Sequence, residues 1–189
     1  VRVKFAGRNL DGWVIERAKP TLENKKLSII EKVISEIPVL EPEIIDVCRI
    51  TADQFVGTLN DTLRFSVPPR QAKIEKKYRY NNTNSKNIKN TELSFYTKKI
   101  NSVEFPPNYD YQNYLIQVLK EVKQNFRQSI MIFPDFNDVI NFDDHLKKNG
   151  FSTQILSAEQ EPSRRYESFL EVLTNSVDVV IGTRNAVFA

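Results

Sequence analysis

Apolar residues in the second half of the chain recur with two alternating periods. Between residues 111 and 126 they follow the i, i+3, i+4, i+7 spacing of an amphipathic helix. Short apolar runs follow at residues 129–133 and 151–156, and each precedes another helical pattern, the first beginning after Asp135 and the second at Pro162. Strands that alternate with helices of this length predict a parallel sheet with right-handed crossovers.

The last strand of this series, residues 177–181, is rich in β-branched residues and stops at Gly182, Thr183 and Arg184. Such a run predicts a buried parallel strand. Its carboxyl end lies where α/β sheets bind their ligands. We expect Arg184 to contact a phosphate, a contact that positions a nucleic acid without reading its bases. The alternative is a salt bridge inside the domain.

The beginning of the chain has the pattern of a β-hairpin. Residues 1–5 alternate between apolar and cationic positions, residues 7–12 have the composition of a turn, and residues 13–15 are apolar again. We therefore predict a hairpin with cations on one face. Such hairpins are common in small barrels, including those that bind single strands. A further strand is expected within residues 27–40.

A helix is expected after Pro42, because proline and flanking acidic residues suit the first helical turn. Cys48 lies on the apolar face of this helix and is expected to be a packed thiol of the core. The next element ends at the double proline of residues 68–69, which cannot continue a helix. Its residues expected to pack inward are Leu59, Leu63 and Phe65.

Charge is distributed unevenly along the 189 residues, although the formal net charge is only +3. Residues 70–99 hold nine lysines and arginines against two acidic residues. This concentration suits the phosphate backbone of nucleic acid, and the alternative is a solvated linker. Because apolar periodicity is missing, we predict a disordered basic linker at residues 71–99. Within it Tyr78, between Lys77 and Arg79, could stack on bases.

Composition limits metal and redox chemistry. The chain has one cysteine and one histidine, whereas a structural zinc site needs about four such ligands. His145 has no nucleophile or metal partner in the sequence pattern, so a surface histidine is expected. Neither a signal peptide nor an apolar run of membrane length is present, and we expect a cytoplasmic protein without membrane contact. Apolar residues at both ends suggest a fragment cut within a domain.

Four runs of the sequence resemble the PriA family of replication-restart helicases. Residues 1–14 are similar to the second half of the family's N-terminal DNA-binding domain, which captures the 3′ end of a leading strand at a stalled fork. Residues 32–43 resemble the run that precedes the helix of that domain. Residues 57–70, from Gly-Thr-Leu to Val-Pro-Pro-Arg, give the most specific match. The run Ile-Gly-Thr-Arg at residues 181–184 is similar to the DNA-contacting edge of the first helicase lobe.

The resemblance implies a chain of mixed α/β and β class. Residues 1–70 would form part of a small β-barrel-like DNA-binding domain with a helix, and residues 71–99 the basic linker in place of a winged-helix domain. Residues 100–189 would form the first part of a RecA-like parallel α/β helicase lobe. The DNA-binding residues expected from charge and resemblance are Arg2, Lys4, Gly7, Arg8, Arg70, Lys77, Tyr78, Arg79, Gly182, Thr183 and Arg184.

The partners implied by the resemblance are DNA, as forks, 3′ ends and single strands, and the proteins that reload the replication machinery. The family's zinc ions belong to a cysteine-rich insert outside this chain. A helicase lobe also needs a G-x-x-x-x-G-K-[ST] loop before its first helix. Residues 100–110 contain neither glycine nor lysine, and Glu104 and Asp110 would repel phosphates.

We therefore expect no usual ATP binding, no cofactor in this chain and no catalytic residue. The expected function is binding of DNA at stalled or abandoned forks and reloading of the replication machinery, without ATP-driven unwinding. An ATP-dependent 3′–5′ DNA helicase of the same family is one alternative, and a non-catalytic interaction scaffold is another. A DNA-modifying enzyme is least favoured, because no constellation of catalytic residues is present.

Overall fold

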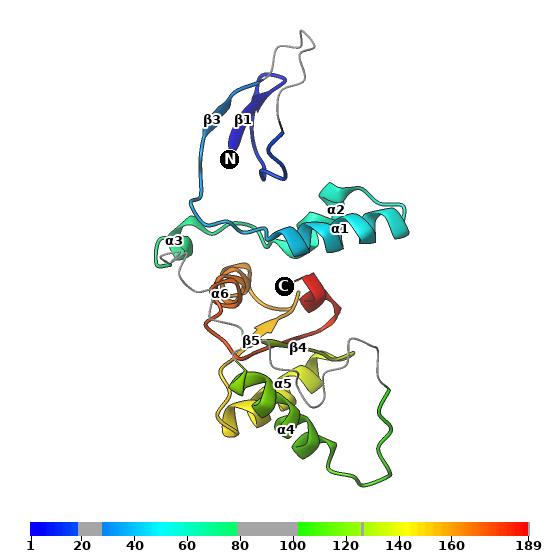
Figure 1. Cartoon of the computed structure of the whole chain (residues 1–189). Coiled ribbons are helices and arrows are strands. Elements are labelled where there is room, and N and C mark those ends of the chain that lie inside the picture. The colour runs from blue at the N-terminus through cyan, green and yellow to red at the C-terminus, as the bar shows by residue number, and fades with distance from the viewer. Residues whose placement is uncertain (19–27, 79–101, 126, 189) are drawn as a thin grey trace. The chain divides into compact units, whose positions relative to one another are not determined.

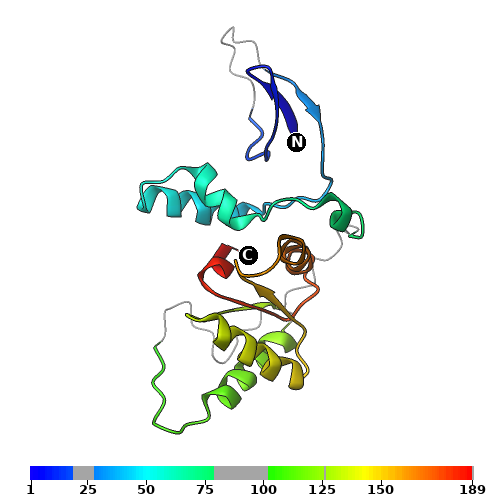
Figure 2. The same cartoon turned by 180° about the vertical axis from the view of Figure 1, so that it is seen from behind.

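The computed structural model describes residues 1–18, 28–78, 102–125 and 127–188, and it divides the chain into two compact units (Figure 1, Figure 2). The first unit is Val1–Val67 and the second is Pro68–Ala189. The first contains a small antiparallel sheet and a helix pair, and the second contains a parallel sheet between helices. The expected mixture of β and α/β structure is confirmed. In the described part of the chain no helix is long and apolar enough to cross a bilayer.

The sheet of the first unit has three antiparallel strands in the order β2-β1-β3. They are β1 (Arg2–Phe5), β2 (Arg8–Asp11) and β3 (Ile30–Lys32). The predicted hairpin is present, but its return strand lies at residues 8–11 and not at residues 13–15 as predicted. The sheet is open in this structure, since β2 and β3 each pair only with β1 among the described strands.

The hairpin turn consists of two residues, Ala6 and Gly7. Their φ angles are +47° and +78°, the left-handed values that a two-residue type I′ turn requires at both positions. This turn matches the right-handed twist of the flanking strands. The return strand therefore begins at Arg8, five residues before the predicted start at residue 13. Glycine reaches such φ values without strain, which gives Gly7 a conformational role.

Two antiparallel helices, α1 (Pro42–Gln54) and α2 (Leu59–Ser66), pack around Cys48. The Cys48 side chain is fully buried, with its sulfur 2.9 Å from the Ser66 hydroxyl. The Thr62 hydroxyl donates to the Cys48 carbonyl at 3.0 Å. The predictions of a helix after Pro42 and of a packed core thiol are confirmed.

Helix α2 begins with a capping box. The Thr58 hydroxyl accepts from the Asp61 amide, and the Asp61 carboxylate accepts from the Thr58 amide. Its buried face consists of Thr62, Leu63 and Ser66. The prediction that Phe65 packs inward was wrong, because the helical period turns its side chain outward and leaves it 55% exposed.

The second unit is built on three parallel strands in the order β4-β6-β5. They are β4 (Ser129–Ile132), β5 (Thr153–Leu156) and β6 (Val179–Gly182). The predicted parallel sheet is confirmed, and so is the burial of its last strand, since every residue of β6 is buried. The prediction that the strand beginning at residue 129 is buried was wrong, because no residue of β4 is fully buried. Strand β4 lies at the edge of the sheet, and Ile130 and Ile132 are about half exposed.

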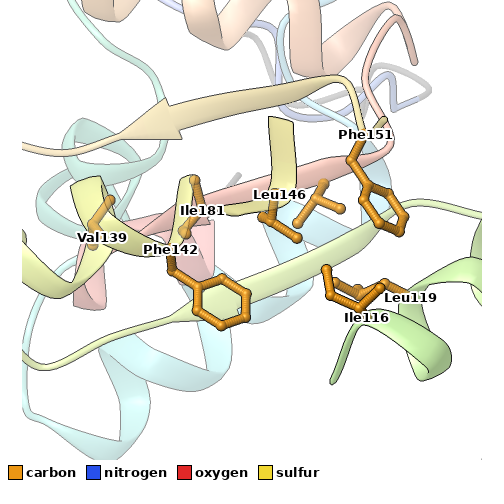
Figure 3. Close-up of a cluster of buried hydrophobic side chains, with 8 residues drawn as sticks. Ile116, Leu119, Val139, Phe142, Leu146, Phe151 and Ile181 are labelled. Atoms are coloured by element: carbon orange, nitrogen blue, oxygen red, sulfur yellow. The ribbon is translucent and has the colours of Figure 1, made fainter. Parts of the chain in front are cut away.

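Helices cover both faces of this sheet (Figure 1). Helices α4 (Tyr111–Gln124) and α5 (Phe136–Lys148) lie on one face, and α6 (Pro162–Leu173) lies on the other. Asp135 caps α5, accepting from the Asn137 amide at 2.7 Å. The core between α4, α5 and the sheet (Figure 3) contains Ile116, Leu119, Val139, Phe142, Leu146, Phe151, Val179 and Ile181.

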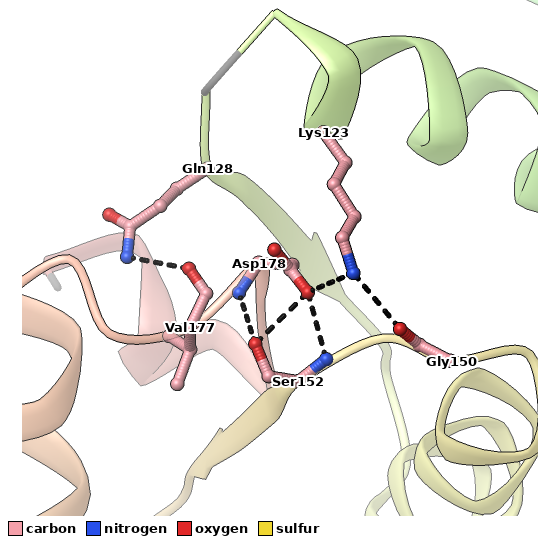
Figure 4. A network of polar contacts seen from close by, with 6 residues as sticks. All are labelled: Lys123, Gln128, Gly150, Ser152, Val177 and Asp178. Carbon is pink, nitrogen blue, oxygen red and sulfur yellow. Dashed lines mark hydrogen bonds and ion pairs between the residues drawn. The ribbon is translucent and has the colours of Figure 1, made fainter. Parts of the chain in front are cut away.

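A polar network ties together the amino ends of the three strands (Figure 4). The Asp178 carboxylate, just before β6, accepts from the amide and hydroxyl of Ser152 at 2.9 and 3.0 Å. It also pairs with the Lys123 ammonium of α4 at 2.8 Å. Beside β4, the Gln128 amide donates to the Val177 carbonyl at 3.1 Å. The network fixes the strand starts against α4 and leaves the opposite, carboxyl edge to carry loops.

We predict that Asp178→Asn destabilises the second unit by about 1–3 kcal/mol at neutral pH, because it removes a charge-assisted, partly buried network. Burial raises the pKa of the Asp178 carboxyl, but hydrogen bonds from Lys123 and Ser152 outweigh burial and lower it below its ordinary value. Because the folded-state pKa is lowered, the ionised carboxylate stabilises the fold at pH values above the unfolded-state pKa of about 3.9. This stabilisation is lost as the pH falls through the folded-state pKa. Urea unfolding at pH 7 and below pH about 4 measures both effects.

Asp144→Asn provides the control, because Asp144 is an exposed carboxylate of α5. Its unfolding free energy should stay near that of the wild type. If the wild type and Asp178→Asn differ equally at both pH values, the carboxylate does not stabilise the fold as an ion.

Candidate nucleic-acid interface

The carboxyl ends of β4 and β6 lie side by side. The Phe133 amide donates to the Gly182 carbonyl at 2.9 Å, so residues 133–135 and 182–184 emerge at the same edge of the sheet. Arg184 begins the 3₁₀ helix η1 (Arg184–Phe188) and is exposed. It forms no ion pair with any described residue, so the internal salt bridge considered from the sequence is not found there. The geometry leaves the Arg184 guanidinium open to an anion.

Gly182 has a structural reason to be glycine. A Cβ atom at this position would lie 2.2 Å from the Leu156 carbonyl oxygen and 2.9 Å from the Ala186 Cβ. These distances are below any van der Waals contact, so a side chain would separate the ends of β5 and β6 or displace η1. Gly182 is also buried. Its close packing sets where Thr183 and Arg184 emerge.

The hairpin of the first unit distributes its cations over two faces. Residues directly opposite in an antiparallel pair share a face, which places Arg2 with Asp11 on one side and Arg8 with Phe5 on the other. The expectation of cations on one face is confirmed for Arg2 and Lys4, whereas Arg8, expected in the turn, lies on β2 and on the other face. Arg2 forms a bidentate pair with Asp11, at 2.7 and 3.0 Å, so its charge is locally balanced. Lys4 is exposed on the face of Arg2.

The start of the predicted linker is folded against the second unit. Residues 71–78 include the short helix α3 (Ala72–Glu75), which packs against α6. Arg70 forms an ion pair with Glu75, whose side chain is 7% exposed. Burial raises the pKa of the neighbouring Tyr166 phenol to about 12, and the Glu75 carboxylate adds to this shift. Arg70, predicted to bind DNA, is thus engaged within the unit.

Tyr78 is anchored to α6 as well. Its hydroxyl donates to the Glu171 carboxylate at 3.2 Å. Burial raises the pKa of the Tyr78 phenol, and Glu171 raises it further, which keeps the phenol in its donating form. Lys77 is exposed beside it, whereas Arg79 and the rest of the predicted linker, to residue 99, lie outside the described residues. Base stacking by Tyr78 stays a prediction, and sequence reasoning missed Glu171 because the pair is 93 residues apart.

The segment before α4 occupies the place expected for a nucleotide-binding loop. The Asp110 carboxylate caps α4, accepting from the Asn113 amide at 3.0 Å. The Phe105 ring stacks on Tyr109 with centroids 5.2 Å apart, and it meets Tyr114 edge-on at 5.4 Å. A carboxylate and packed aromatic rings therefore lie at the amino terminus of α4.

Metal-binding side chains are dispersed in the described part of the chain. No three histidine, cysteine, aspartate or glutamate residues are grouped there as metal ligands. Cys48 is buried in the helix pair of the first unit. His145, expected at the surface, is half-buried on α5 and lies against the Phe142 ring at 5.8 Å. These residues do not fit a structural zinc site.

Comparison with known proteins shows which proteins the chain resembles. Residues 1–68 match the family model of the PriA 3′ DNA-binding domain. The whole chain is 28% identical over 216 residues to the probable replication restart protein PriA of Mycobacterium tuberculosis (strain CDC 1551 / Oshkosh). It is also 28% identical over 214 residues to the protein of that name from Mycobacterium leprae (strain TN). The chain is therefore similar over its whole length to PriA proteins, and its first 68 residues match their 3′ DNA-binding domain. It spans 32% of the length of these relatives.

The PriA domain match and the structure divide the chain at almost the same point. The match ends at residue 68, and the first compact unit ends at Val67. Within the matched part lie Arg2, Lys4, Gly7 and Arg8. The remaining predicted DNA-binding residues lie in the second unit or outside the described residues. The two sets therefore belong to separate structural units and can be tested separately.

We predict that Gly182→Ala lowers the unfolding free energy of the second unit by about 1–3 kcal/mol, because the added methyl group overlaps the Leu156 carbonyl. Urea unfolding followed by far-ultraviolet circular dichroism measures the change. The matched control is Gly57→Ala, where the nearest atom to an added Cβ is 4.0 Å away. Equal stability of the two variants would show that the end of β5 can move aside at no cost.

Proposed function

We propose that this chain binds DNA at stalled or abandoned replication forks and helps to reload the replication machinery without ATP-driven unwinding. The match of residues 1–68 to a 3′ DNA-binding domain supports DNA as the partner, with the 3′ end of a leading strand as the feature bound. The relatives' name, replication restart protein, supports the fork as the place of action. Loading proteins are the proposed protein partners.

The segment before α4 is the part of the structure that supports the absence of ATP-driven unwinding. Phosphates bind at a helix amino terminus when free backbone amides and a glycine-rich loop surround them. Here the Asp110 carboxylate already accepts the Asn113 amide, and it would repel a phosphate at the same position. Residues 102–110 contain no glycine that would let the backbone approach. The residues present do not fit the phosphates of ATP, and ATP has no part in the proposed function.

The carboxyl edge of the parallel sheet is the proposed DNA contact of the second unit. Thr183 and Arg184 emerge there beside residues 133–135. The exposed guanidinium supports a phosphate contact, which would position a strand without reading its sequence. In the first unit Lys4 and Arg8 are the proposed contacts, since Arg2 is balanced by Asp11.

Two other functions remain distinguishable by experiment. An ATP-dependent 3′–5′ helicase would bind DNA with an affinity that changes with the nucleotide. A protein-interaction scaffold would lack salt-dependent affinity for DNA. Fork binding without unwinding predicts salt dependence and indifference to nucleotide.

We predict that the chain binds a fluorescent fork with a recessed leading-strand 3′ end and that this affinity falls steeply with salt. If the chain neutralises six or more phosphates, its affinity falls by about 10³-fold or more as the salt concentration rises from about 50 to 200 mM. A non-hydrolysable ATP analogue should leave the dissociation constant unchanged. Fluorescence anisotropy across a salt series, with and without the analogue, measures both. A fork of the same length with a blocked 3′ end is the control for end recognition.

Each arm of this experiment has a result that contradicts the proposal. A dissociation constant that shifts with the analogue would mean that the segment before α4 binds nucleotide after all. Absence of binding at every salt concentration would remove DNA as the partner of this chain. Equal affinity for open and blocked forks would retain DNA binding but not the 3′ end.

A further inference from the structure

A group of exposed cations lies on α3, on the two residues that follow it and on the first turn of α6. Helices α3 and α6 are neighbours in space (Figure 1, Figure 2). We call this group the α3–α6 surface. Lys73 and Lys76 are three residues apart and therefore project from the same side of the short helix. The four exposed members of the surface, none of which forms an ion pair with a described residue, are Lys73, Lys76, Lys77 and Arg164.

Two anchors hold α3 in place beneath these cations. At its start Arg70 pairs with the buried Glu75. After its end the Tyr78 hydroxyl donates to Glu171, and Glu171 also accepts from the Gln154 amide of β5. The lysines are thus carried on a backbone segment that is attached to both α6 and the sheet. Cations on an ordered segment lose less conformational entropy on binding than cations on a flexible linker.

Two of the acidic residues nearby are already engaged. Glu75 is buried under α3 and paired with Arg70, and Glu171 accepts from Tyr78 and Gln154. Glu167 is half-buried on α6, three residues after Arg164, and it offsets part of that one charge. The three lysines keep their charge toward solvent. The α3–α6 surface is therefore cationic although α6 itself carries equal numbers of acidic and basic residues.

We propose that the α3–α6 surface is a second phosphate-binding surface for the DNA of the fork, in addition to the hairpin contacts and to Arg184. The proposal rests on the proposed function, since it assigns another contact to the same ligand. Lys73, Lys76, Lys77 and Arg164 contact phosphates, and Arg70 and Tyr78 are positioning residues that hold α3. Point-charge contacts of this kind bind the backbone of any sequence.

This assignment changes the role expected for the basic segment. A disordered linker could contact DNA in many positions, whereas a surface attached to α6 can contact DNA at one place only. The first part of the segment then adds affinity to the second unit itself. Because phosphate contacts position a duplex or strand, the surface also limits the orientation of DNA on this unit.

The test compares two double variants of the full chain in the fork-binding assay. Lys73→Glu with Lys76→Glu removes two proposed contacts, and it should weaken fork binding by about tenfold or more at about 0.1 M salt and reduce the salt slope by about two. Lys120→Glu with Lys148→Glu makes the same charge change on exposed residues of α4 and α5, on the other face of the sheet. The control should bind nearly as well as the wild type.

The outcomes separate this surface from the function on which it rests. If the wild type binds and both double variants lose affinity equally, net charge alone acts and the α3–α6 surface is rejected. If the wild type does not bind fork DNA, the proposed function fails first. If the lysine variant lacks the circular dichroism spectrum of the folded chain, Arg164→Gln, on a different helix, repeats the test. A normal salt slope for Arg164→Gln would exclude α6 from the surface.

Discussion

The second unit depends on the burial of β6 between two parallel partners. Val179, Val180 and Ile181 are almost fully buried, and each side of this strand contacts a different helical layer. The strand can be central only because Gly182 has no side chain where the Leu156 carbonyl approaches. At its other end Asp178 links the strand starts to α4. The amino edge of the sheet is therefore fixed by a polar network, and the carboxyl edge carries the residues of the candidate interface.

Much of this unit could be predicted from the sequence because its patterns are long and regular. The helices at residues 111–124, 136–148 and 162–173 follow the 3.6-residue period, and the apolar runs between them form the strands. Short elements were harder to predict. The hairpin turn requires two left-handed residues, and only Gly7 of the pair signals this in the sequence. Helix α3 spans four residues, too few for any period to be seen within a basic segment.

The candidate interface was predictable only where it follows from topology. Residues 133–135 and 182–184 had to meet because parallel strands end at one edge of a sheet. The partners of Arg2 and Tyr78 had to come from the structure, since they depend on strand register and on a contact across 93 residues. Such pairings decide which cations remain available. Counting charge along the chain overestimates the contribution of Arg70 and Arg2 to DNA binding. It also overlooks Arg164, which lies beside the basic segment only in the folded chain.

The segment before α4 and the α3–α6 surface support the same view of the second unit. A lobe that binds ATP must keep a helix amino terminus free for phosphates, whereas here Asp110 occupies it and aromatic rings pack beside it. These contacts stabilise the start of α4 without any ligand. Among the described residues, cations without an ion pair lie elsewhere, at Arg184 and on and just after α3. In the proposed function the parallel sheet would then serve as a rigid support that spaces phosphate contacts, and its stability would be independent of nucleotide. DNA affinity would depend on how firmly α3 and the end of β6 are held.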